Sequence, residues 1–126
     1  MINTLNDLGY KPSVDDDGDV AFRYQMKAVY VLGTMEEDTN YLVVILPQIY
    51  EMEEGEEIKA LTACNKLTRE LSFAKVYIDS TFKNVNACCE IYYCDEECLK
   101  SQLEQALNVI SQVRSTFLKA MRELDE

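Results

Sequence analysis

Residues 73–99 read FAKVYIDSTFKNVNACCEIYYCDEECL, and the spacing of the apolar residues changes within this stretch. Residues 73–79 and 85–94 alternate between apolar and other side chains, which predicts two strands joined by a hairpin loop at residues 80–84. Asp95 is the expected N-cap of a following helix, because an acidic first turn and then helical spacing come after it. A strand pair that leads into an amphipathic helix is typical of an α+β domain.

The last helix is predicted to continue to the C-terminus, because its apolar residues keep helical spacing for about seven turns. These positions are Leu99, Leu103, Ala106, Leu107, Ile110, Val113, Phe117, Met121 and Leu124. Such a helix is about 40 Å long, roughly twice the length of a typical strand. We therefore expect Val113, Phe117, Met121 and Leu124 to overhang the sheet and to need a partner surface, unless the first helix folds back over them.

The upstream residues predict two more helices and three more strands. Ile2, Leu5 and Leu8 have helical spacing that ends at Gly9. Three strands are expected at Val20–Met26, Ala28–Leu32 and Tyr41–Leu46, and the second helix is expected to bury a stripe of Ile58, Leu61, Cys64, Leu67 and Leu71. The order is α-βββ-α-ββ-α, an antiparallel sheet with helices packed on one face, and 126 residues suit a single domain over residues 1–126.

The strand Tyr41–Leu46 is apolar on both faces, which is typical of a central strand. The helices would cover one of these faces. A monomer that exposed the other face together with the overhanging helix would show a larger apolar patch than soluble proteins usually tolerate. We therefore expect a homodimer, the commonest way of covering such a patch.

Acidic residues dominate the chain, whose formal net charge is −11. This charge would repel nucleic acids and anionic membranes, and it favours basic partners or simply keeps the protein soluble. The run Asp15 to Asp19 contains an Asp-Gly pair that suits a hairpin turn. A calcium loop is not expected, because Gly18 is fourth in the run and Met26 occupies the position where an EF-hand has glutamate.

The remaining features favour a cytoplasmic protein without a cofactor. The N-terminus lacks the basic start and apolar run of a secretory signal, and no segment is long enough to span a bilayer. Five cysteines, an odd number, are expected to stay free thiols in a reducing compartment: Cys64, Cys88, Cys89, Cys94 and Cys98. No metal site is expected, since neighbouring strand residues point to opposite faces, although a cysteine-based metal or redox module is the main alternative function.

Catalysis is not expected, because the chain has no histidine to pair with a serine or cysteine nucleophile, and an enzyme is the third hypothesis. The tyrosines are more informative. Tyr77 and Tyr92 should lie on the sheet face away from the helices, where Tyr30 or Tyr41 would join them. Tyrosine is favoured at protein interfaces, so these residues indicate either a partner surface or an ordinary half-exposed sheet face.

The segment Asn65 to Asp79, NKLTRELSFAKVYID, resembles the YbjN family, described as bacterial sensory transduction regulators. The matching positions are Asn65, Leu67, Phe73, Lys75, Tyr77 and Asp79, and Thr68 departs from the pattern by replacing an asparagine. The Leu8-Gly9-Tyr10 start and the Asp-Gly hairpin are also similar. This resemblance implies a fold like that of type III secretion chaperones and a dimerising, noncatalytic domain that binds a protein or peptide partner in a regulatory or chaperone-like role.

Overall fold

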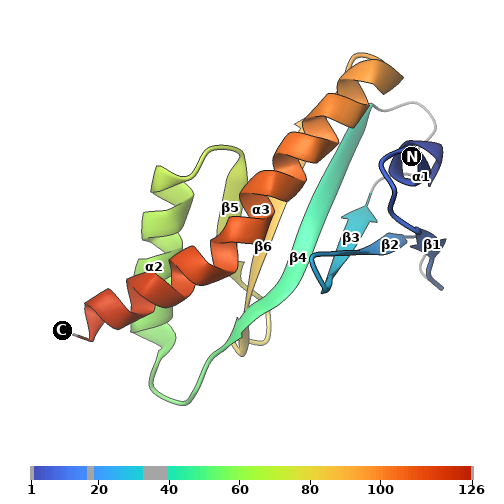
Figure 1. The fold of residues 1–126 in the computed structure, drawn as a ribbon. Coiled ribbons are helices and arrows are strands. Elements are labelled where there is room, and N and C mark those ends of the chain that lie inside the picture. Colours follow the sequence, from blue (N-terminus) through green and yellow to red (C-terminus); the bar gives the residue numbers. More distant parts are fainter. Residues whose placement is uncertain (1, 17–18, 33–39, 126) are drawn as a thin grey trace.

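The computed structural model describes residues 2–16, 19–32 and 40–125, which form an antiparallel sheet covered by three helices (Figure 1). The helices are α1 (Ile2–Asp7), α2 (Glu57–Glu70) and α3 (Glu96–Leu124), and the strands are β1 (Ser13–Val14), β2 (Val20–Tyr24), β3 (Lys27–Leu32), β4 (Tyr41–Glu51), β5 (Ala74–Ile78) and β6 (Asn84–Tyr92). The strands are ordered β1-β2-β3-β4-β6-β5. The predicted α+β class and its order are confirmed, with the two-residue strand β1 added.

The core lies between the sheet and the helices, which share one face. Alternate residues of the strands are buried there, as in β4, where Leu42, Val44 and Leu46 point into the core. They pack with the apolar stripe of α3 and with Leu5 of α1 in one continuous cluster. Among the helices of the described residues, none combines the length and apolar character needed to cross a membrane.

The α3 N-terminus forms as its sequence predicts. Asp95 is extended, and its Oδ1 accepts the backbone N–H of Cys98 at 2.8 Å, which satisfies one of the free donors of the first turn. The predicted hairpin at Asp15–Asp19 also joins β1 to β2, with Asp15 N–H donating to Asp19 O at 2.9 Å. Residues 17–18 of this turn lie outside the described residues. The turn expected between Gly33 and Asn40 also lies outside them, except for Asn40 itself.

Several strand ends differ from the prediction, and β6 ends at Tyr92 rather than at the predicted Cys94. Three of the differences lie at irregularities of the backbone or of the strand pairing. The strand predicted to reach Met26 ends at Tyr24, because Gln25 and Met26 have positive φ angles of 50° and 67° and form a tight turn into β3. β4 continues past Leu46 to Glu51 through an irregularity in its pairing with β6. β5 begins at Ala74 and not at the predicted Phe73, because Phe73 has a positive φ of 66° and is not extended.

The predicted stripe of α2 is wrong at its start. Ile58 and Leu61 are 79% and 49% exposed, whereas Ala60 and Ala63 are fully buried beside Cys64 and Leu67. Alanine has the smallest side chain that still packs as an apolar residue, so a face of alanines lets the helix approach the core closely. This close approach turns the two larger aliphatic side chains toward the surface.

The C-terminal half of α3 is buried against other parts of the same chain, so the prediction that it overhangs the sheet is wrong. Val113 and Phe117 are 0% exposed and Met121 is 4% exposed, while Leu124 is 44% exposed. The helix that covers them is α2, which packs against α3 (Figure 1), and not the first helix. The ring of Tyr50, near the end of the extended β4, also contacts Phe117, with 5.4 Å between ring centroids.

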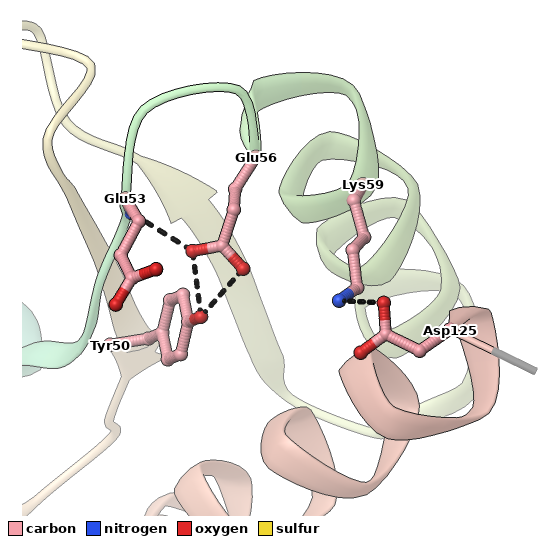
Figure 2. A network of polar contacts seen from close by, with 5 residues as sticks. All are labelled: Tyr50, Glu53, Glu56, Lys59 and Asp125. Carbon is pink, nitrogen blue, oxygen red and sulfur yellow. Dashed lines mark hydrogen bonds and ion pairs between the residues drawn. The ribbon is translucent and has the colours of Figure 1, made fainter.

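Polar contacts hold this end of the molecule together (Figure 2). The Tyr50 hydroxyl donates to the Glu56 carboxylate, whose oxygens lie 2.8 and 2.9 Å away. Glu56 Oε1 also accepts the backbone N–H of Glu53 at 2.9 Å, so the carboxylate closes the loop between β4 and α2. Lys59 of α2 forms an ion pair with Asp125, just beyond α3. Burial and then the hydrogen bond with Glu56 raise the pKa of Tyr50 to about 12.

Phe117→Ala should destabilise the folded chain by roughly 3–5 kcal/mol, because it removes a fully buried ring from the chain's own core. Leu124→Ala is the matched control on the same helix and should change the free energy of unfolding by about 0.5 kcal/mol or less. Urea unfolding measures both. If Phe117→Ala altered the association state and left stability unchanged, the ring would pack between chains.

Tyr50→Phe should lower the free energy of unfolding by about 1 kcal/mol at neutral pH, because it removes the hydroxyl that binds Glu56. The folded pKa of about 12 lies above the unfolded value of about 10, so this contribution is complete below pH 10 and is lost as the pH rises toward 12. Denaturant unfolding at several pH values should therefore show the two curves converging above pH 10. Tyr92→Phe, on a 76% exposed ring, should match the wild type throughout.

Candidate functional site

The sheet face away from the helices is the main candidate surface, and we call it the open face. It is formed by the residues that alternate with the core positions of β3 to β6: Tyr30, Leu32, Tyr41, Val43, Ile45, Lys75, Tyr77, Cys88, Glu90 and Tyr92. No helix of the described residues covers it (Figure 1). It is therefore the largest surface on which the sheet itself can meet a partner.

The centre of the open face is apolar. Tyr30 pairs with Ile45 and Ile45 with Cys88, so these side chains form one row across three strands. Leu32 and Val43 form the next row. The four other side chains of these two rows are half-buried, and Cys88 is 6% exposed. Both rows are therefore already partly removed from water. A partner that covered the exposed part of these side chains would bury more apolar surface, and this burial would favour binding.

A polar cluster borders this apolar centre. Lys75 of β5 forms an ion pair with Glu90 of β6, and the Tyr41 hydroxyl donates to Glu90 Oε2 at 3.0 Å. The ring of Tyr41 also packs on that of Tyr92, with centroids 4.7 Å apart. Lys75 and then Tyr41 lower the pKa of Glu90, which keeps this carboxylate charged. The cluster thus supplies a fixed charge pair and a pair of rings at one end of the face.

A cavity of about 230 Å³ lies at the same end of β6, between that strand and α3. Its lining residues are Phe73, Cys89, Glu90, Ile91, Tyr92, Gln102, Gln105 and Ala106. Gln102 Nε2 donates to the Tyr92 carbonyl at 3.0 Å. Gln102 Oε1 is buried, and within the described residues it has no hydrogen-bond partner. The cavity therefore has apolar wall residues and a buried hydrogen-bond acceptor on Gln102, with Glu90 and Gln105 as further polar lining residues.

The predicted site residues fall into two groups. Tyr30, Tyr41, Tyr77 and Tyr92 all lie on the open face, and the structure brings Tyr41 and Tyr92 into contact. The other group does not form a surface: Val113, Phe117 and Met121 are buried in the core, and Leu124 alone is exposed.

Several residues of this surface were not predicted. Lys75 and Glu90 alternate with the core positions of β5 and β6, so the strand period could have placed them beside the tyrosines. Phe73, just before β5, and Gln102 of α3 line the cavity from distant parts of the chain, and no local sequence pattern indicates that they come together.

The cysteines differ from the expected five free thiols. Cys94 and Cys98 are joined in a disulfide, with their Cα atoms 6.2 Å apart, whereas Cys64, Cys88 and Cys89 are free and buried. The potential ligand atoms of Cys94, Asp95 and Cys98 lie within 4.8 Å of one another, a spacing that a metal could use only with both thiols reduced.

Comparison with known proteins agrees with the geometry of the fold. YbjN from E. coli, a proposed transcription regulator, is similar with a TM-score of 0.71 at 13% identity, over 88% of this chain and 83% of its own. An uncharacterised protein from Methanothermobacter thermautotrophicus has a TM-score of 0.63 at 8% identity, over 96% and 93% of the two chains. No curated protein matches the sequence.

A third similar structure is the HopA1-SchA chaperone-effector complex, with a TM-score of 0.57 at 14% identity, over 96% of this chain and 86% of the other. At these identities the likeness shows the fold alone. A family model provides the stronger link, because it matches residues 2–123, nearly the whole chain. The chain therefore belongs to the family described as T3SS (YopN, CesT) and YbjN peptide-binding chaperone 1.

Proposed function

We propose that residues 1–126 act as one noncatalytic domain that binds an extended segment of a partner protein on the open face, as a chaperone or regulator of that partner. The observation that carries this proposal is the apolar row of half-buried Tyr30 and Ile45 beside buried Cys88, on a face that no described helix covers. Membership of a peptide-binding chaperone family supports it.

The chemistry of the surface suggests what kind of segment would bind. An extended chain presents alternate side chains to one side, so apolar residues at every second position would match the apolar rows. The chain's net charge of −11 favours basic residues between them, because complementary charge speeds encounter and selects partners. The partner segment is thus expected to be apolar and basic in alternation.

A noncatalytic role is supported by the places where pKa values shift. Asp79 has a pKa of about 2 because Thr81 and then its other hydrogen bonds in the β5–β6 turn stabilise its charge. Cys64 and Cys89 have pKa values raised by burial in the core. Each shift has a local structural cause. Cys89 and Glu90 both line the cavity beside β6, but Asp79 and Cys64 lie outside it, so the shifted groups are spread over the molecule and are not gathered as catalytic groups are.

We further propose a homodimer formed through the outer surface of α2, in a cytoplasmic setting. Ile58 and Leu61 are one turn apart and are 79% and 49% exposed, on the helix that packs against the edge strand β5. An exposed apolar pair beside an unpaired sheet edge suits an isologous contact, in which the same patch meets itself. This surface leaves the apolar rows of the open face available to a peptide.

Ile45→Asn should raise the Kd for a fluorescent Leu-Lys alternating peptide about tenfold or more, because it replaces an apolar contact at the centre of the open face. Val14→Asn, on a 52% exposed side chain of β1, is the matched control and should bind like the wild type. Fluorescence anisotropy measures both. A Ser-Lys alternating peptide of the same charge should bind weakly, and equal binding of the two peptides would contradict an apolar recognition face.

Light scattering should report twice the chain mass of 14.5 kDa for the wild type at micromolar concentration. Leu61→Asp should give one chain mass with an unchanged circular dichroism spectrum, because a charge at an apolar twofold contact meets its own copy. Leu124→Asp, on α3, is the control and should stay dimeric. A wild type that remains monomeric at every concentration would rule out the dimer and leave the peptide proposal to the binding assay.

A further inference from the structure

The connection between β6 and α3 carries a feature that peptide binding does not use. Cys94 follows the end of β6 by two residues, and Cys98 lies in the first turn of α3. Their disulfide therefore links the two sides of a sharp junction, with a sequence separation of 4. Cys94 is exposed and Cys98 is half-buried, so small reagents in solution can reach the pair.

We propose that Cys94 and Cys98 form a reversible thiol–disulfide switch that small-molecule disulfides and thiols operate, and that its state sets the rigidity of the cavity between β6 and α3. The proposal stands on the junction alone and does not depend on the proposed peptide partner.

Accessibility selects this pair among the five cysteines. Cys64, Cys88 and Cys89 are buried within the fold, at 5%, 6% and 1% exposure. Burial also raises the pKa of each of these three thiols, so little of the reactive thiolate forms there. Oxidants should therefore act at the junction and leave the three buried thiols intact.

Reversibility follows from the position of the bond. The ring that it closes is short, so the disulfide removes less chain entropy than one closing a long loop. Exposed disulfides are also the more easily reduced ones. Reduction would leave α3 capped, because Asp95 holds the N–H of Cys98 through its carboxylate and not through sulfur.

The reaction with oxidised glutathione balances as two thiol–disulfide exchanges. The thiolate of Cys94 attacks one sulfur of oxidised glutathione and releases one glutathione thiolate. The thiolate of Cys98 then attacks Cys94 Sγ in the mixed disulfide and releases the second. Two electrons pass from the cysteine pair to the oxidised glutathione, and the two thiol protons end on the two reduced glutathione molecules.

The cavity is coupled to this bond through its walls. Ile91 and Tyr92 line it from β6, and Gln102 and Ala106 line it from α3. The hydrogen bond from Gln102 Nε2 to the Tyr92 carbonyl is a noncovalent tie between these walls. With the disulfide closed, a covalent tie joins the same two elements, so the walls should separate less often.

The first experiment incubates the full chain in glutathione buffers of varied ratio, alkylates the remaining thiols after acid quenching and counts them by mass spectrometry. We expect five alkylated cysteines in reducing buffer, three in oxidising buffer, and full return on reversal. Cys64→Ala is the control and should keep the switching pair, whereas Cys94→Ser should remove it. A pair that stays reduced in excess oxidised glutathione, or stoichiometric zinc in the reduced protein, would overturn the proposal.

The second experiment compares hydrogen exchange of the oxidised and reduced chains. Amides of residues 96–102 should exchange roughly tenfold more slowly after oxidation, while those of α2 should not change. In Cys94→Ser both treatments should give the rate of the reduced wild type. Equal rates in the two states of the wild type would show that the bond does not control the cavity walls.

Discussion

The packing of α3 across one face of the sheet is the constraint on which the rest of the structure depends. Leu103, Leu107, Ile110, Val113 and Phe117 along this helix are all fully buried. They join the strands, α1 and α2 in one core, so all three helices are committed to the same side. The opposite side is then left to the strands themselves, and its apolar rows are only half-buried in the described residues. A surface suited to a partner therefore results from the way the core is built.

The same constraint explains the polar network at the far end of α3. A helix that extends past the centre of the sheet needs other elements beneath it, and here these are α2 and the continued strand β4. Tyr50 supports α3 directly and also positions α2. Its ring packs on Phe117, and its hydroxyl fixes Glu56 in the loop before α2. Residues 51–57, at the start of α2, contain five glutamates. This acidic run thus has a specific contact besides its general attraction to a helix N-terminus. A single acid in the run performs this role, and sequence composition does not show which one.

Much of the fold could be predicted from local patterns, because period and capping act over a few residues. The alternation in β5 and β6 and the Asp95 cap are of this kind, and so is the placement of Tyr77 and Tyr92 on the open face. The errors arose where distant elements decide the outcome. Ile58 and Leu61 fit an apolar stripe, yet Ala60 and Ala63 allow closer packing and are buried in their place. Phe117 was expected to overhang because helix length was compared with a short strand, whereas β4 has 11 residues and α2 lies alongside. For the cysteines, the strand period places Cys88 and Cys89 on opposite faces, but it gives no sign of the turn that brings Cys94 to Cys98.

Tyr92 connects the two surfaces to which we assign function. Its ring packs on Tyr41 at the edge of the open face, and its carbonyl accepts a hydrogen bond from Gln102 on the helix side of the sheet. Cys94 follows two residues later, so the backbone that positions the ring continues directly into the disulfide. A change in the rigidity of this junction would therefore alter how firmly the Tyr92 ring of the open face is held. Binding that orders a surface costs less when the surface is already held in place, so the oxidised chain would present a better ordered edge to a partner than the reduced chain.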